Sequence, residues 1–163
     1  MAFGRSSRIQ IKTPAQLELM RAAGLVVART LKQLESEIAD GITTLDIDAI
    51  ARENLKREGA TSSFLGYHGY PAVVCTSVND EVVHGIPSHR RLQEGDLVSV
   101  DFGAIVEGWH GDAARTFFVG EVSPELQRLS AVTEASMWAG LARSEEHTSE
   151  LPVTSLSRMP SSA

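Results

Sequence analysis

Two aspartates that flank a glycine turn most constrain the fold of this chain. Asp101 lies in an apolar segment, and Asp112 lies beyond the Glu-Gly turn at residues 107–108. A two-residue turn there predicts a β-hairpin in which Asp101 pairs with Ala114, and the same register places Asp112 opposite Gly103. Side chains alternate between the faces of a strand, so both carboxylates are expected on one face. A shift of the turn by one residue would place them directly opposite each other, again on one face.

This pair of carboxylates indicates a metal site. An ionised carboxylate is costly to leave unpaired in an apolar strand, and two that converge repel each other. A divalent cation held between Asp101 and Asp112 would remove both costs. The alternative is structural, with Asp112 solvated and Asp101 in a salt bridge with Arg115 or a more distant base. The Asp-x10-Asp spacing is a weak pattern by itself and leaves both interpretations open.

A histidine is the second candidate site residue. His84 ends an expected short strand at residues 81–84 and is followed by Gly85-Ile86-Pro87, where the backbone can bend sharply. A neutral imidazole placed there could contact a substrate amide near a metal centre. The alternative is a core histidine whose ring is hydrogen-bonded to the backbone.

Five aromatic or sulfur-containing residues are candidates for a substrate pocket. They lie before and within an expected strand at residues 72–78. They are Phe64, Tyr67, His68, Tyr70 and Cys75. Such side chains pack well against one apolar side chain, especially a thioether. The alternative is a satellite core cluster beneath a loop. Other conspicuous residues are assigned to packing or turns (Trp109, His110 and Trp138) or to solvated turn charges (Asp80, Glu81 and Glu94).

Helices are expected on both sides of these segments. The first begins at Thr13-Pro14 and stops at Asp40-Gly41, and the second is capped by Thr43 or Thr44 and ends at Gly59. The third begins at Ser123-Pro124, with an apolar face formed by Leu126, Leu129, Val132, Ala135 and Ala139. Strands are expected at residues 72–78, 81–84, 97–102 and 109–119. The pattern predicts an α/β (α+β) fold, with an antiparallel sheet and covering helices.

Length and charge exclude several classes of protein. The chain has 163 residues and a net charge of -6, so one domain is expected, with no footprint for nucleic acid or a membrane surface. The single cysteine, Cys75, fits a reducing compartment. No apolar run approaches the ~20 residues of a membrane span, and the first residues lack a secretory signal. A cytoplasmic protein is expected.

Residues 143–163 differ from the rest of the chain. They are rich in serine, lack helical or strand periodicity, and are expected to break the third helix at residues 143–145. The segment Arg-Ser-Glu-Glu-His-Thr-Ser-Glu-Leu at 143–151 matches the in-frame translation of a common sequencing-library adapter. We therefore expect a partial domain at 1–142 and a low-complexity, non-native tail at 143–163. A natural disordered tail is the alternative.

Three motifs in this order and spacing resemble type I, bacterial methionine aminopeptidases. They are Gly-Tyr-His-Gly-Tyr-Pro at 66–71, the run from Val74 to Pro87, and Val-Asp-Phe-Gly at 100–103 with Gly-Trp-His-Gly-Asp at 108–112. The resemblance covers residues 8–142. It implies that residues 1–142 are a partial peptidase domain, the N-terminal half of the pita-bread fold, which methionine aminopeptidases share with creatinase-like proteins. It also implies removal of the N-terminal methionine from nascent proteins.

The resemblance implies a role for each candidate residue. Asp101 and Asp112 correspond to the first two metal ligands of a site for two divalent ions (Co, Mn, Fe or Zn). His84 corresponds to a catalytic, substrate-contacting histidine. Phe64, Tyr67, His68, Tyr70 and Cys75 correspond to positions at the methionine pocket. The family's other ligands, one histidine and two glutamates, and its second catalytic histidine are not assigned here.

The resemblance also implies the protein's partners. They are the N-terminal peptides of nascent proteins, at the ribosome, with no nucleic acid or membrane partner and a monomer at full length. This chain alone, with two of the ligands, is expected to bind metal weakly and to show little activity. The alternatives are another pita-bread peptidase of the Xaa-Pro aminopeptidase or prolidase type, or a non-catalytic pita-bread module that binds proteins.

Overall fold

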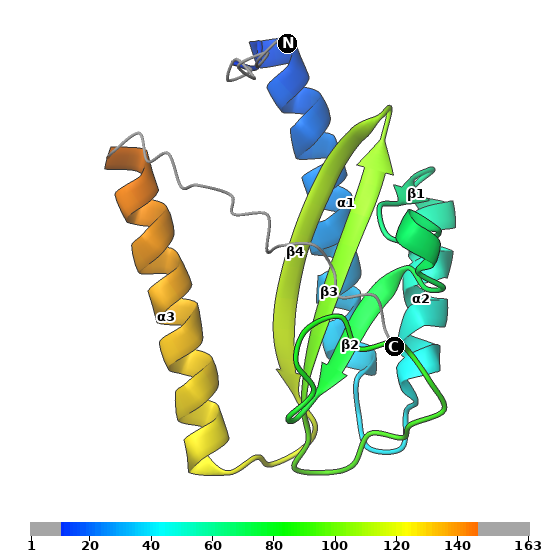
Figure 1. The fold of residues 1–163 in the computed structure, drawn as a ribbon, viewed down its shortest axis with the longest axis vertical. Coiled ribbons are helices and arrows are strands. Elements are labelled where there is room, and N and C mark those ends of the chain that lie inside the picture. The colour runs from blue at the N-terminus through cyan, green and yellow to red at the C-terminus, as the bar shows by residue number, and fades with distance from the viewer. Residues whose placement is uncertain (1–10, 147–163) are drawn as a thin grey trace, which may run out of the picture.

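The computed structural model describes residues 11–146, which form three helices beside an antiparallel sheet (Figure 1). In chain order the elements are α1 (Pro14–Glu37), α2 (Thr44–Arg57), β1 (Thr61–Ser62), a 3-10 turn (Tyr67–Gly69), β2 (Val74–Val78), β3 (Leu97–Val106), β4 (Trp109–Phe118) and α3 (Pro124–Glu146). β3 is the central strand of the sheet. It pairs with β4 along one edge and with β2 and β1 along the other.

The first two helices begin at the expected caps. Thr13 accepts a hydrogen bond from the backbone N–H of Gln16, and Thr43 accepts one from Asp46; each forms a capping box. α1 ends at Glu37 rather than at Asp40, because Ile38 turns into an extended conformation. Gly41, with a φ of 86°, then makes the turn into α2.

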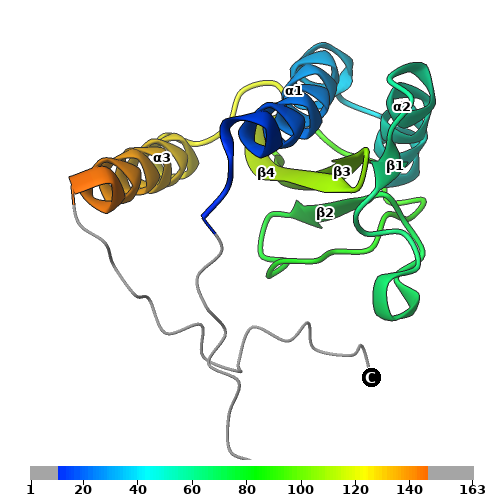
Figure 2. The same ribbon diagram turned by 90° about the horizontal axis from the view of Figure 1, so that it is seen from above.

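α1 and α2 cover one face of the sheet, and the opposite face of β3 and β4 carries no helix in the described part of the chain (Figure 2). Val98, Val100 and Phe102 project from β3 into the core beneath the helices, where each is fully buried. Alternate residues of β3, including Ser99 and Asp101, therefore face the other side. That open face is where the candidate site residues gather.

The β3–β4 hairpin has the register expected from the sequence. Asp101 pairs with Ala114 and Gly103 pairs with Asp112. The turn consists of Glu107 and Gly108, with φ values of 48° and 80°, the left-handed pair typical of a tight hairpin.

The expected strand at residues 81–84 is wrong. This segment forms a loop, because Val83 and His84 both have positive φ values, of 37° and 61°. Two consecutive residues in the left-handed region cannot continue an extended strand. The loop follows the outer edge of β2, where the carbonyl oxygen of Gly85 accepts the N–H of Thr76 at 2.8 Å.

The third helix differs from expectation in two ways. It continues through Arg143 to Glu146 instead of breaking at 143–145, and a basic residue in the last turn suits the negative end of a helix. Its apolar residues are exposed, Leu129 by 59% and Val132 by 55%. Trp138, assigned to packing or a turn, is also 59% exposed, and its indole N–H donates to Glu134. The remainder of the expected tail, residues 147–163, lies outside the described residues.

No described helix combines the length and apolar character needed to cross a membrane.

Candidate metal and substrate site

The two hairpin aspartates lie side by side on the open face of the sheet. Burial, the charge of Asp112 and a hydrogen bond shared between the two carboxyl groups together raise the pKa of Asp101 to about 6. The backbone N–H of Phe102 acts in the opposite direction. Two acidic groups that share a proton are separated by a small distance and lack a neutralising partner. This is the arrangement into which a cation fits.

Arg115 does not neutralise this pair. It lies on the helix-facing side of β4, where its guanidinium forms an ion pair of 2.6 Å with Glu35 of α1. The salt bridge that would have given Asp101 a purely structural role through Arg115 is therefore excluded.

His84 and Asp101 line the same pocket, which has a volume of about 320 Å³. The sheet contributes Cys75, Ser77, Ser99, Asp101 and Ala114, and the loop after β2 contributes Glu81, Val82, Val83 and His84. The imidazole thus comes from a loop, whereas the carboxylates come from two strands. The structure thus places His84 and Asp101 at one pocket, and Asp112 contacts Asp101 without lining that pocket.

Tyr70 and Cys75, two of the five residues expected at a substrate pocket, lie against each other. The hydroxyl of Tyr70 lies within hydrogen-bonding distance of the carbonyl oxygens of Val74 (2.9 Å) and Gly85 (3.2 Å). Burial, together with the neighbouring Cys75, raises the pKa of Tyr70 above its usual range. Burial also raises the pKa of the Cys75 thiol, so both groups are held neutral.

The other three pocket candidates are divided between core and surface. Phe64 is buried and packs over Gly103, where its ring leaves no room for a Cβ atom. Tyr67 is 54% exposed, and its ring meets the ring of His68 edge to face at 4.4 Å between centroids. His68 is also exposed. These two residues stand at the surface instead of closing a buried cluster with Tyr70.

The sequence interpretation missed two polar contacts at this face. Glu81, assigned as a solvated turn charge, accepts the N–H of Val78 at 2.9 Å and pairs with Arg90 at 2.6 Å. His110, assigned to packing or a turn, shares a hydrogen bond of 3.0 Å with the hydroxyl of Ser63. The acidic residue three positions after Val78 is the signal that could have indicated a side-chain cap of the turn.

The donor set for a metal is partial. No group of three or more histidine, cysteine, aspartate or glutamate residues is arranged to hold a metal ion in the part of the chain that the structure describes. Asp101 and Asp112 nevertheless offer two carboxylates at one point, with an affinity for positive charge that raises the pKa of Asp101. The residues present therefore fit a hard or borderline divalent ion that takes its remaining ligands from elsewhere.

The sequence matches metallopeptidase family M24 over residues 18–150. It is 50% identical to the methionine aminopeptidase of Clostridium acetobutylicum over 136 residues, which are 83% of this chain and 54% of that protein. Methionine aminopeptidase 1 of Bacillus subtilis is 47% identical over 130 residues, 80% of this chain and 52% of that protein. The chain spans about half the length of the curated relatives it matches.

Solved structures confirm the expected fold class. The crystal structure of methionine aminopeptidase from Thermotoga maritima has a TM-score of 0.76 at 42% identity, covering 78% of this chain and 51% of that chain. The X-Pro aminopeptidase of the same organism has a TM-score of 0.62 at 23% identity, covering 72% and 32%. At that identity the second likeness shows only the shared pita-bread fold. The relatives also confirm the resemblance carried by the three motifs.

Proposed function

The chain belongs to metallopeptidase family M24, and from this premise we propose that it forms part of an enzyme that removes the N-terminal methionine from nascent proteins. The observation that supports this most directly is the pocket lined by both His84 and Asp101, with Asp112 held against Asp101. The methionine aminopeptidases among the relatives support the choice of substrate. The proposed substrates are N-terminal peptides, met at the ribosome in the cytoplasm by a monomeric enzyme.

Asp101 and Asp112 are the proposed ligands of two divalent ions, of cobalt, manganese, iron or zinc. When bound, such ions lower the pKa of a water molecule and polarise the scissile carbonyl group. The two carboxyl groups must lose their shared proton to bind a cation. The pKa of Asp101, about 6, is still below neutral pH, so the deprotonated form is available there. Metal affinity is expected to decrease when the pH is lowered below about 6.

His84 is the proposed catalytic residue on the substrate side of the pocket. His84 comes from the loop after β2 and lines the same cavity as Asp101, into which a peptide group near the metal ligands would project. There it can donate a hydrogen bond to the substrate amide and to the negative charge that develops on attack.

Tyr70, Cys75 and Phe64 are the proposed inner wall of the methionine site, with Tyr67 and His68 at its mouth. A thioether gains from contact with aromatic edges and a polarizable sulfur. The neutral Tyr70 and Cys75 present no charge that would favour a polar side chain.

The experiment that tests the function supplies the remainder of a relative. Residues 1–142 are joined to the part of the Clostridium acetobutylicum enzyme that lies beyond the matched region, and the chimera is assayed with manganese or cobalt. A Met-Ala-Ser peptide is compared with an Ala-Pro-Ala peptide. We expect cleavage of the methionyl peptide, and a loss of at least about 100-fold in kcat/KM in the His84→Ala variant.

The outcomes separate the alternatives. A preference for the Xaa-Pro peptide would point to the prolidase type of activity. A folded, metal-loaded chimera without turnover would favour a binding module. For the 163-residue chain by itself we expect little turnover, because two carboxylates leave the metal ions short of ligands; turnover equal to that of the chimera would contradict this.

A further inference from the structure

The loop that carries His84 is fastened to the outer edge of β2. Strand β2 pairs with β3 along one edge, and its other edge directs N–H groups toward this loop. Thr76 donates to the carbonyl oxygen of Gly85 at 2.8 Å, and Val78 donates to the carboxylate of Glu81 at 2.9 Å. The hydroxyl of Ser77 accepts the N–H of Gly85 at 3.2 Å. The loop therefore takes the place that a further strand would occupy.

The backbone of this loop is in a disfavoured conformation at the site. Val83 and His84 have φ values of 37° and 61°, in the left-handed region where a Cβ atom is crowded and a β-branched side chain is rare. Consecutive residues stay in this region only where surrounding contacts hold them. A Cβ atom at Gly85 would collide with the carbonyl oxygen of Thr76, so this residue lies directly against β2.

We propose that Ser77 and Glu81 are positioning residues for His84, and that their hydrogen bonds to the loop hold the imidazole in the pocket it shares with Asp101. Each acts on one side of the strained segment: Glu81 fastens its beginning to Val78, and Ser77 fastens Gly85 at its end. The catalytic meaning of this placement rests on the proposed function. The contacts themselves do not depend on it.

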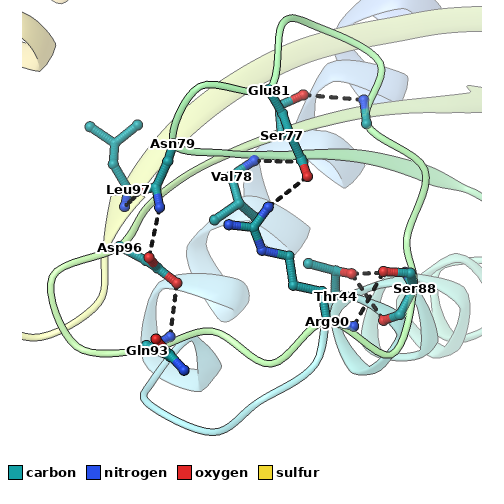
Figure 3. Close-up of polar contacts among 11 residues, drawn as sticks. Thr44, Ser77, Val78, Asn79, Glu81, Ser88, Arg90, Gln93, Asp96 and Leu97 are labelled. Carbon is teal, nitrogen blue, oxygen red and sulfur yellow. Dashed lines mark hydrogen bonds and ion pairs between the residues drawn. The ribbon is translucent and has the colours of Figure 1, made fainter.

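A second set of contacts anchors Glu81 from the other side (Figure 3). Its second carboxylate oxygen pairs with Arg90 at 2.6 Å, so one side chain ties β2 to the returning part of the loop. Further along, the hydroxyl of Thr44 donates to the carbonyl oxygen of Ser88 and accepts its N–H, at 3.0 and 2.8 Å. The loop is thus held at both ends: Glu81 fastens the stretch before His84, and Ser77 bonds to Gly85, the residue directly after it.

The test uses the 163-residue chain and two readouts that do not require turnover. Amide hydrogen exchange at Thr76 reports whether the loop is docked, because its N–H donates to the carbonyl oxygen of Gly85. The carbon and proton signals of the His84 ring report whether the imidazole has moved. The variants are Ser77→Ala and Glu81→Ala, and Glu81→Gln is the conservative rescue, since its amide oxygen can still accept the N–H of Val78.

Matched controls are available on the same chain. Ser99→Ala removes a hydroxyl that lines the same pocket but bonds to Thr116. Glu53→Ala removes a glutamate whose ion pair with Lys56 lies on α2, away from the loop. Exchange at an amide of β3 shows whether the sheet itself remains intact in every variant.

We expect Thr76 to exchange about five- to tenfold faster in Ser77→Ala and in Glu81→Ala, with displaced His84 ring signals and unchanged exchange in β3. Glu81→Gln should restore both readouts in large part. His84 ring signals that stay in place in both alanine variants would overturn the proposal, as would equal displacement in Ser99→Ala. Displaced signals in a protein whose chimera cleaves no methionyl peptide would instead count against the proposed function alone.

Discussion

At the scale of single residues, the acidic pair is the part of the site with a measurable electrostatic signature. Asp101 sits in an apolar strand beside Asp112, and its pKa is raised to about 6 by burial and by that neighbour. Its folded-state pKa is therefore above its ordinary value. The folded chain without metal binds this proton more tightly than the unfolded chain does, so the associated stability is present at low pH and is lost as the pH rises through about 6.

The substitution Asp101→Asn tests this charge. It removes the ionisation and keeps the shape of the side chain. As the pH rises from about 4 to about 8 without metal, the free energy of unfolding of the variant should therefore increase by about 1–3 kcal/mol relative to that of the parent. Urea denaturation across this range measures the difference. Asp40→Asn, at an exposed position, is the control and should show no such trend. A difference between Asp101→Asn and the parent that stays constant with pH would contradict the assigned pKa.

The residues also show where sequence reasoning succeeds. The position of Asp101 and Asp112 on one face could be predicted because the register of a hairpin follows from its two-residue turn, and the faces follow from strand alternation. The role of Glu81 could not be predicted from the sequence. Its contacts with Val78 and Arg90 depend on how the loop folds back along the edge of the strand. The exposure of Tyr67 likewise depends on the turn at residues 67–69, which the aromatic composition of the segment does not reveal.

At the scale of elements, the close packing of α1 on β4 determines which face of the β3–β4 hairpin is covered and which is open. A Cβ atom at Gly111 would lie 2.5 Å from the backbone nitrogen of Gly24, so the strand and the helix meet backbone to backbone. Asp112 is the next residue of that strand and points to the other face. The helix contact thereby supports the acidic pair from behind.

Two glycine substitutions at this contact should have opposite effects. Gly111→Ala should lower the free energy of unfolding by about 1–3 kcal/mol, because the added methyl group meets the α1 backbone. Gly24→Ala should raise it by about 0.5–1 kcal/mol, because alanine favours a helix and a Cβ atom there has open space around it. Thermal or urea unfolding measures both. Equal effects of the two substitutions would contradict the described packing.

The elements predicted correctly share a local cause. α1 and α2 begin at side-chain caps, and β3 and β4 are joined by a turn whose residues suit a left-handed backbone. The segment 81–84 has the composition of a strand but no partner strand with which to pair. Its conformation is instead determined by the side-chain and backbone hydrogen bonds that hold its two ends.

At the scale of the whole molecule, the described chain consists of one packed unit, the sheet with α1 and α2, and one exposed helix, α3. The buried cluster lies between the sheet and the first two helices, whereas α3 lies apart from it (Figure 1). The chain also spans about half the length of the relatives it matches. The core that supports the candidate site is therefore independent of α3.

Substitutions in α1 and α3 should reveal this division. Leu129→Ala, at a residue 59% exposed on α3, should change the free energy of unfolding by less than about 0.5 kcal/mol. Leu34→Ala, at a fully buried residue of α1, should lower it by about 2–5 kcal/mol. Urea denaturation of both variants gives the comparison. A loss above about 2 kcal/mol in Leu129→Ala would show that α3 packs on the core.

The most direct measurement is the site of manganese binding, read from paramagnetic broadening of backbone amide signals in the 163-residue chain at neutral pH. Substoichiometric Mn²⁺ should first broaden the signals of Asp101, Asp112 and the residues paired with them, Ala114 and Gly103. His84, from the same pocket as Asp101, should follow. In the Asp101→Asn variant this pattern should disappear. Broadening centred on other acidic residues, or an unchanged pattern in that variant, would contradict a metal site on the β3–β4 hairpin.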